Sequence, residues 1–475
     1  MDITAELARR RTESPRAPAV SVRRQDGWES VDWGTLHDNS HKAAGAAAGL
    51  PPGPVALVLD NSPAGVAVLF GLLIAGVAVA PLEPDTSQLA DVRSPVRRVS
   101  ATVVGPPGGT ATTAGPPDLT YPDLLTGRQR DAVPPGHEGE VLQLTSGSTG
   151  TPKLARQPAG NAVRGARLYR DLHDLGPDDV LLAAVPLAHS FGLVGALTTA
   201  LVTGAHLRTG ERFSTRAVLD GLERDATVLL STPLGCRLLA GAIGPHGRRT
   251  GLRVALCSGG PLSPEVAASA ADRLGVPVRQ VYGSTETGLI ACRHGHAEDG
   301  PADALGVMAP GVSWRLRTGN GELTEYGEGT LLVRTSTMLL GHRGTDRPPE
   351  YDRGWYVTGD TARVDAAGRV TVLGRKASFV NVGGRKVNAG RVEAVVGDCP
   401  GVREAAAYGV VNSSQEEELW AALVLEDGYG PEDVMSYCRS RLTPYETPHH
   451  LQVVTALPRN AMGKVVRGAL PGAGA

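Results

Sequence analysis

The ten residues Leu144–Lys153, with the sequence LTSGSTGTPK, constrain this chain more than any other segment. They hold five hydroxyl side chains and two glycines, and Pro152–Lys153 closes the run. The preceding Glu140–Leu144 (EVLQL) reads as a short apolar strand, so we expect a loop that leaves a strand. Glycines let successive backbone N–H groups point into one concavity, and small hydroxyl groups add donors. Such a loop suits a polyphosphate.

Two better-known loop types do not match this segment. A P-loop requires glycine directly before its lysine and serine or threonine after it, whereas Lys153 stands between Pro152 and Leu154. A nucleophile elbow requires Gly-x-Ser-x-Gly, and that spacing does not occur in the run. From composition alone, a flexible polar loop without a ligand remains an alternative.

Composition excludes several classes of protein. The 475 residues are enough for about three domains. The 47 basic and 49 acidic residues nearly cancel, so we expect no nucleic-acid partner and a nucleotide held only locally. Five widely spaced cysteines without a Cys-x-x-Cys pair, and an N-terminus without an apolar signal core, favour a reducing, cytoplasmic location.

The segment Ala64–Leu82 has no charged residue, which is also typical of a membrane span. Glycines and Pro81 interrupt it, and it is at the lower limit of spanning length. A buried helix from about Pro63 to Ala75, followed by a buried strand at Val77–Ala80, explains it better. We therefore expect no membrane partner.

Strand and helix patterns alternate from the glycine–hydroxyl loop to about residue 282, which predicts an α/β fold with much parallel sheet. In such sheets ligands gather in loops beyond the carboxyl ends of the strands, where we expect the polar motifs to lie. Trp28 and Trp33 are expected on a hairpin-like segment, and Val103–Leu119 as a surface connection. The expected elements are strands at Asp179–Pro186, Ala226–Ser231, Arg253–Ser258 and Pro277–Tyr282 and helices at Ser190–Leu201 and Pro264–Leu274.

After Arg375 the pattern changes to a compact α+β unit. We expect a large multi-sheet N-terminal domain over residues 1–375 and a small C-terminal domain over residues 376–475. The elements expected in the second are helices at Asn388–Gly397 and Pro431–Arg441 and strands at Glu404–Val411, Glu418–Leu425 and Leu451–Val454.

Five further polar motifs follow the glycine–hydroxyl loop. In order and wording, all six resemble the motifs of the ANL superfamily of adenylate-forming enzymes, which comprises acyl- and aryl-CoA synthetases, adenylation domains of nonribosomal peptide synthetases and luciferases. The resemblance covers nearly the whole chain and is closest to the acyl and aryl acid ligases. The motifs are PLAHSF (Pro186–Phe191), SGG (Ser258–Gly260), YGSTETG (Tyr282–Gly288), WYVTGD (Trp355–Asp360) with Gly374–Arg375 behind it, and PRNAMGKVVR (Pro458–Arg467).

The resemblance implies that a carboxylate attacks the α-phosphate of ATP, giving an acyl adenylate and pyrophosphate. The carboxylate and the α-phosphate are both anions, so the rate depends mainly on charge neutralisation and positioning. Lys464 would bridge the attacking carboxylate and the α-phosphate, because a point charge on a flexible stem neutralises charge at the transition state. Glu286 would ligate Mg²⁺, a hard cation that prefers carboxylate and phosphate oxygens. Thr285 would donate a hydrogen bond to the α-phosphate.

The resemblance also implies the nucleotide site. The glycine–hydroxyl loop would hold the leaving β- and γ-phosphates, Tyr282 would offer a face for adenine, and Asp360 would meet the ribose hydroxyls with Arg375 near the same sugar. The implied ATP-binding residues are Thr145, Ser146, Gly147, Ser148, Thr149, Gly150, Lys153, Ser258, Gly259, Gly260, Gln280, Tyr282, Gly283, Ser284, Thr285, Asp360 and Arg375.

His189 resembles the histidine between the acyl pocket and the nucleotide in acyl and aryl ligases, which makes it a candidate catalytic residue. Amino-acid-activating relatives carry, one residue further on, an aspartate that pairs the substrate ammonium, whereas this chain has Ser190. Burying an unpaired ammonium is costly, so we expect a non-amino carboxylic acid. The implied substrate-binding residues are His189, Ser190, Phe191, Gly259, Gly260 and Gly288.

In the family the C-terminal unit is mobile and rotates after adenylation, for transfer to a thiol. Gly383 and Gly384 match the residues that would pass a pantetheine arm, although a hairpin turn explains them equally well. The expected acceptor is coenzyme A or the phosphopantetheine arm of an acyl carrier protein. Two departures from the family pattern are Leu154, where a glycine is usual, and Ala377, where the hinge residue is commonly aspartate.

Two alternatives remain open. An amide synthetase would pass the adenylate to an amine, and Ala377 is compatible with it. A catalytically inactive nucleotide-binding protein would act by interaction, but the presence of Lys464, Glu286 and Asp360 counts against it. His294 and His296 have metal-like spacing without convincing partners and are expected on a solvated loop.

Overall fold

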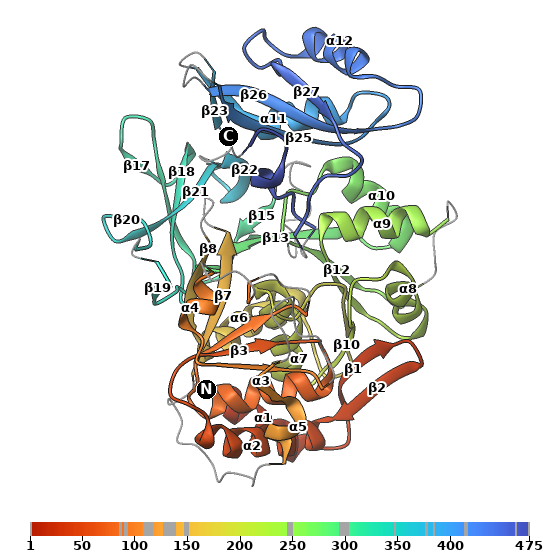
Figure 1. Ribbon diagram of the computed structural model, residues 1–475, viewed down its shortest axis with the longest axis vertical. Coiled ribbons are helices and arrows are strands. Elements are labelled where there is room, and N and C mark those ends of the chain that lie inside the picture. Colours follow the sequence, from red (N-terminus) through yellow and green to blue (C-terminus); the bar gives the residue numbers. More distant parts are fainter. Residues whose placement is uncertain are drawn as a thin grey trace. The chain divides into compact units, whose positions relative to one another are not determined.

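The computed structural model describes residues 2–84, 88–89, 94–107, 117–126, 139–146, 152–244, 250–293, 304–345, 348–375, 379–382, 385–412, 417–460 and 463–473. The chain forms two compact units, which are described separately (Figure 1). The first comprises Met1–Trp314, Val333–Tyr356 and Ala366–Val370, and the second Arg315–Leu332, Val357–Asp365 and Thr371–Ala475. The expected α/β class, with one large multi-sheet unit and one small unit, is confirmed. A domain boundary at Arg375 stays a prediction.

The described part of the first unit is built on two largely parallel sheets. The strands are β1 (Pro18–Arg24), β2 (Gly27–Asp32), β3 (Val55–Val58), β4 (Val79–Leu82), β5 (Thr102–Gly105), β6 (Leu119–Thr120), β7 (Glu140–Ser146), β8 (Pro152–Pro158), β9 (Val180–Ala183), β10 (His206–Gly210), β11 (Val228–Ser231), β12 (Val254–Cys257), β13 (Val278–Ser284), β14 (Gly288–Cys292), β15 (Gly306–Met308), β19 (Gly341–Arg343) and β20 (Tyr351–Asp352). One sheet has the order β19-β8-β7-β4-β3-β5-β6, and the part of the other sheet that lies in this unit has the order β15-β14-β13-β12-β11-β9-β10-β1-β2.

Helices cover these sheets. They are α1 (Ile3–Glu13), α2 (Trp33–Ala46), the short η1 (Ala47–Gly49), α3 (Pro63–Ile74), α4 (Pro95–Val99), α5 (Tyr121–Leu125), α6 (Ala159–His173), the π-helix η2 (Phe191–Thr198), α7 (Thr199–Thr203), α8 (Thr215–Arg224), α9 (Pro233–Ala242) and α10 (Pro264–Leu274). Figure 1 shows α8, α9 and α10, in green, beside the β10–β13 region. Their apolar faces pack on Leu182, Leu229 and Ala255 of the sheet in one buried cluster.

The apolar segment that was compared with a membrane span forms α3 and β4. Ser62 caps the helix by accepting a hydrogen bond from the Gly65 N–H, and Pro63 occupies the first turn. A Cβ on Gly71 would lie 2.5 Å from Ser40 O, so glycine permits the close approach of α2. Among the described residues, no helix is long and apolar enough to cross a membrane.

The second unit ends in a three-stranded sheet, β25 (Val402–Val411), β26 (Glu417–Leu425) and β27 (His450–Val453), in that order. Helices α11 (Ala389–Gly397) and α12 (Pro431–Arg441) pack on one face, against Ala407 and Leu419. Alternate residues such as Tyr408 face the other side. The remaining elements are β17 (Leu323–Thr324), β23 (Phe379–Val382), β24 (Arg385–Asn388) and the short η5 (Arg467–Ala469). Four strands are divided between the two units, namely β16 (Ser313–Arg317), β18 (Gly327–Arg334), β21 (Trp355–Val364) and β22 (Arg369–Arg375).

Two expectations about local structure are wrong. Trp33 is the buried first residue of α2 and not part of a hairpin, because Asp32 caps the helix by accepting from the Thr35 N–H. The connection expected at Val103–Leu119 is wrong only at its two ends, because it begins within β5, which pairs in parallel with β3, and ends in β6; residues 108–116 lie outside the described residues. Pairing between distant strands therefore overrides the local composition.

A buried charged network joins β9 to β12. Asp179 is 6% exposed, and its carboxylate accepts hydrogen bonds from Arg253 Nε at 2.8 Å and Nη2 at 2.6 Å. Arg253 also donates to the carbonyls of His173 and Asp174. Burial alone would raise the pKa of Asp179, but hydrogen bonds from Arg253, Gly176 and Thr227 hold that pKa below its ordinary value.

We expect Arg253→Met to lower the free energy of unfolding by about 2 kcal/mol at neutral pH, because it leaves a buried carboxylate without its cation. Arg253 is itself 40% exposed, which places the loss below that of a fully buried pair. The difference in free energy of unfolding between wild type and Arg253→Met should shrink as the pH falls through the depressed folded-state pKa of Asp179, since a protonated carboxyl no longer pairs with the guanidinium. Urea denaturation measures both effects. Arg170→Met, which removes the exposed pair with Asp171, is the control and should change stability by less than about 0.5 kcal/mol.

Candidate active site

The glycine–hydroxyl segment connects two antiparallel strands. Thr145 pairs with Lys153 and Ser146 with Pro152 at the adjoining ends of β7 and β8. The prediction that the whole segment is a loop is therefore wrong at both ends, because β8 folds back and extends β7 by backbone pairing. Gly147, Ser148, Thr149 and Gly150, like the side chain of Ser146, lie outside the described residues.

The segment before η2 brings His189 and Ser190 to the carboxyl ends of strands. His189 Nε2 lies 2.5 Å from Oε1 of Glu83, the residue that directly follows β4. Ser190 Oγ donates to Gln143 Oε1 on β7 at 2.6 Å and lies 3.0 Å from Thr285 Oγ1. Three predicted site residues, His189, Ser190 and Thr285, thus lie together, while Phe191 is buried at the start of η2.

Sequence reasoning missed Glu83 and Gln143. Glu83 follows a fully buried strand, and Gln143 is a polar residue in an apolar one; either position could have marked them. Gln143 is 5% exposed, and its amide also donates to Ala188 O at 3.5 Å. A buried amide needs such partners, so Gln143 fixes the Ser190 segment to β7.

Asn61 holds the same segment from the other side. Its Nδ2 donates to Gly210 O at 2.9 Å, and its Oδ1 accepts from Leu187 N at 3.2 Å. The residue is buried and has a φ of 60°, in the left-handed region that asparagine tolerates better than most residues. Asn61 therefore links β10 to the segment that carries His189.

The turn that carries Thr285 and Glu286 is held through its carbonyl groups. Gln157 Nε2 on β8 donates to Thr285 O at 2.6 Å, and Leu339 N donates to Glu286 O at 2.8 Å. The hydroxyls of Thr335 and Thr337 donate to Thr287 O at 2.6 and 2.7 Å. Three consecutive carbonyls thus have protein partners, which orders the backbone before any ligand binds.

The SGG motif follows β12 directly, as expected. Ser258 Oγ donates to Val281 O at 2.9 Å, and Gln280 Nε2 donates to Gly260 O at 3.2 Å. Gly259 has a φ of 98°, which glycine adopts without strain. A Cβ on Gly260 would meet nothing closer than 3.9 Å, so the backbone there is open to a flat ligand. Tyr282, Gly283 and Ser284 lie on β13, and Gly288 begins β14.

The second unit holds the other predicted residues. Asp360 is buried within β21, and its N–H donates to Thr358 Oγ1 at 3.1 Å. Lys464 is exposed. The side chain of Arg375, and Gly383 and Gly384, lie outside the described residues. The expectation that every polar motif occupies a loop beyond a parallel strand is wrong for Tyr282–Ser284 and for Asp360, which lie within strands.

The donor set suits Mg²⁺ and ATP. Mg²⁺ usually takes one or two protein carboxylates together with substrate phosphates and water, so the carboxylate of Glu286 suits the metal and the neighbouring Thr285 hydroxyl suits a phosphate oxygen. Where the chain is described, no group of three His, Cys, Asp or Glu side chains could hold a metal ion. The metal and nucleotide roles of these residues stay predictions.

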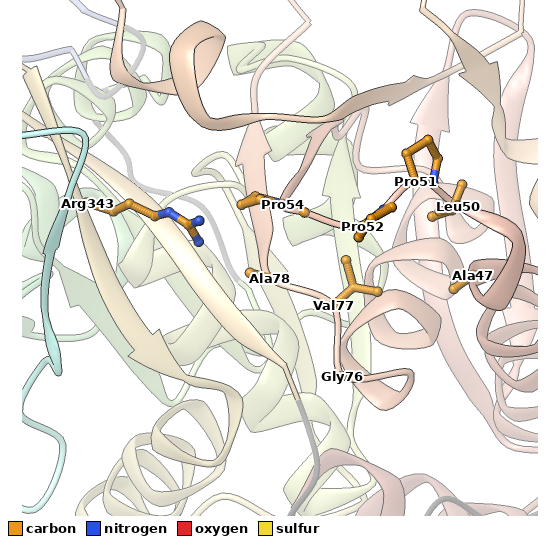
Figure 2. Close-up of a pocket in the computed structure, with 10 residues that line it drawn as sticks. Ala47, Leu50, Pro51, Pro52, Pro54, Gly76, Val77, Ala78 and Arg343 are labelled. Atoms are coloured by element: carbon orange, nitrogen blue, oxygen red, sulfur yellow. The ribbon is translucent and has the colours of Figure 1, made fainter.

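A separate pocket of about 350 Å³ lies at the opposite ends of β3 and β4 (Figure 2). Pro51, Pro52 and Pro54 line it before β3, and Val77 and Ala78 line it before β4. Asn61 and Glu83 follow the same two strands, so the pocket is at the other edge of the sheet from the polar groups.

Two family models match the chain. The model described as AMP-binding enzyme matches residues 7–342, and the model described as AMP-binding enzyme C-terminal domain matches residues 391–464. The indoleacetate–CoA ligase of Aromatoleum aromaticum is 31% identical over 73% of this chain and 70% of its own length. The feruloyl-CoA synthase of an Amycolatopsis species is 29% identical over 97% of this chain and 96% of its own length.

Solved structures agree with this likeness. O-succinylbenzoate coenzyme A synthetase from Bacillus subtilis, in complex with ATP and magnesium, superposes with a TM-score of 0.83 at 22% identity over 98% of both chains, which shows the fold. The amide bond synthetase McbA from Marinactinospora thermotolerans has a TM-score of 0.79 at 25% identity, also over 98% of both chains.

The chain therefore belongs to the AMP-binding enzymes, the ANL superfamily of adenylate-forming proteins. Within that superfamily it is an enzyme of the acid–CoA ligase family.

We expect Gly283→Ala to destabilise the first unit, because the added Cβ would lie 2.3 Å from Gly288 O across the β13–β14 pair. A backbone atom cannot move aside cheaply, so the free energy of unfolding should fall by an amount on the order of 1–3 kcal/mol. The thermal midpoint should fall with it by several degrees. Gly260→Ala is the matched control for stability, since its Cβ has open space. Equal midpoints for the two variants in circular dichroism would contradict the packing described for this turn.

Proposed function

We propose that the enzyme activates a non-amino carboxylic acid, aryl or acyl, as its adenylate with release of pyrophosphate, and then transfers the acyl group to the thiol of coenzyme A or of a carrier-protein phosphopantetheine. The observation that carries the choice of acid is the engagement of Ser190 with Gln143 and Thr285. A hydroxyl held in this way provides no negative charge for a substrate ammonium. Among the described residues bonded to the His189–Ser190 pair, the carboxylate is Glu83, and it is engaged by His189.

Each role in this proposal follows from charge. The substrate carboxylate and the α-phosphate repel each other, and the ammonium of Lys464 would offset that repulsion as the new P–O bond forms. Glu286 would hold Mg²⁺, which supplies positive charge to the phosphates. Thr285 would donate its hydroxyl to the α-phosphate. Asp360 would accept hydrogen bonds from the ribose hydroxyls.

An aryl acid is the first class to examine. The curated relatives include enzymes named for indoleacetate and for the feruloyl group, both aromatic carboxylic acids. Phe191 is buried, and its ring centroid lies 6.3 Å from that of the buried Tyr169, so two aromatic rings pack next to the Ser190 segment. A screen of pyrophosphate release across aryl, cinnamyl and fatty acids would identify the class.

Transfer to an amine is the second candidate. Two observations favour it, namely the likeness to the amide bond synthetase McbA and the presence of Ala377 at the hinge position. Membership of an enzyme family counts against the alternative of another class, a nucleotide-binding protein without catalysis, and acid-dependent turnover would exclude it.

We expect acid-dependent exchange of labelled pyrophosphate into ATP, and we expect Lys464→Ala to slow that exchange roughly a hundred- to a thousandfold, the usual effect of losing one group that stabilises transition-state charge. Arg439→Ala removes an exposed cation on α12 and should exchange at the wild-type rate. Unchanged exchange in Lys464→Ala would refute the assignment of the lysine.

The acceptor is tested with the acid that the screen selects. With ATP and coenzyme A we expect a thioester by mass spectrometry, because a thiolate is a good nucleophile towards an acyl adenylate. A parallel reaction that replaces coenzyme A with a panel of primary amines reports the alternative. Amide formation without any thioester would favour the amide synthetase.

A further inference from the structure

The segment that carries Lys464 is seated on the second unit by apolar contacts at both ends. Leu457 and Leu470 are buried against Tyr408 and Ala422, on the face of β25 and β26 opposite α11 and α12. Val465, next to Lys464, packs into the same cluster. The exposed lysine is therefore held on a segment that is itself anchored.

Hydrogen bonds pair residues 458–460 with residues 463–466 as the two arms of a hairpin, and residues 461–462 between the arms lie outside the described residues. Asn460 N donates to Lys464 O at 2.9 Å, and Lys464 N donates to Asn460 Oδ1 at 2.9 Å. Val466 N donates to Pro458 O at 2.8 Å, and Arg459 and Val465 form a β-bridge. Both backbone groups of Lys464 are thus fixed.

Arg467 ties the end of the hairpin to a strand and a helix at once. Its Nη2 lies 2.5 Å from Glu393 Oε1 on α11, and its Nε donates to Ala407 O on β25 at 3.2 Å. The Ala407 N–H donates to the same Glu393 oxygen at 2.8 Å. Because β25 is at the end of the sheet order, the Glu393–Arg467 pair satisfies both backbone groups of Ala407 that no neighbouring strand of that sheet pairs.

A second ion pair holds the start of the hairpin. Arg459 Nη2 lies 2.6 Å from Glu404 Oε2, three residues before Ala407 on β25, and Arg459 Nη1 donates to Gly463 O at 2.6 Å. The two arginines of the PRNAMGKVVR motif therefore fasten the hairpin to one strand on both sides of Lys464.

We propose that Arg467 and Glu393 are positioning residues for adenylation, which set the place of the Lys464 backbone and thereby of its ammonium. The proposal rests on the role of Lys464 in the proposed function. Charge stabilisation depends steeply on position, and a displacement of about 1 Å typically costs on the order of a hundredfold in rate. Arg467 does this through a planar fork that reaches a carboxylate and a carbonyl together, which a lysine cannot reproduce.

The test compares Arg467→Met, Arg467→Lys and Glu393→Gln in the full-length enzyme, with the acid selected by the screen. We expect Arg467→Met to lower kcat for pyrophosphate exchange at least about tenfold while KM for ATP and for the acid changes less than about threefold. Arg467→Lys should recover part of the rate, since an ammonium still pairs with Glu393. Glu393→Gln should lower kcat in the same sense.

A second readout separates positioning from simple loss of structure. Consumption of a chemically supplied acyl adenylate by the acceptor does not require two anions to be brought together, so Arg467→Met should leave this step within about twofold of wild type. Arg391→Met is the matched control. Arg391 lies on α11, the helix that carries Glu393, and the change removes its pair with Glu446 without touching the hairpin. It should leave both steps unchanged.

The outcomes are distinct. Wild-type exchange in a folded Arg467→Met, or equal losses in exchange and in adenylate consumption, would overturn the positioning role. If Arg467→Met does not fold, the kcat of Arg467→Lys and Glu393→Gln decides, and wild-type values for both would overturn it. Wild-type exchange in Lys464→Ala would instead refute the proposed function of the lysine.

Discussion

The hydrogen bonds of Ser190 join the two sheets of the first unit. Its hydroxyl meets Gln143, from a strand of one sheet, and Thr285, from the turn after a strand of the other. Gln143 is almost fully buried, so its amide must be satisfied within the protein. The contact therefore fixes the spacing of the strand ends, and the positions of His189 and of the Thr285–Glu286 turn depend on it.

Much of the fold could be predicted because its elements carry local signals. The helices at Pro264–Leu274 and Pro431–Arg441 were predicted with their observed bounds, since each has proline in its first turn and a clear change of pattern at its end. The failures have a common cause. Thr145 and Ser146 extend a strand only because β8 folds back on it, and Thr102–Gly105 is a strand only because β3 lies beside it. Such pairing is not encoded in either segment alone.

The same limit applies to the site. The residue sequences of the motifs identified His189, Ser190 and Thr285, and the structure brings these three together. The motifs could not locate Glu83, Gln143 or Gln157, which act through contacts between residues far apart in the chain. These residues are polar side chains in or just after apolar strands, a signal that becomes specific only when the neighbouring strand is known.

The three satisfied carbonyls of Thr285, Glu286 and Thr287 have a thermodynamic consequence. A turn whose backbone is already immobilised loses little conformational entropy when a ligand arrives, so more of the contact energy is expressed as affinity. The cost of that order falls on the folding reaction, where neighbouring threonines and Gln157 offset it. Preorganisation at this turn is thus a property of the apoprotein.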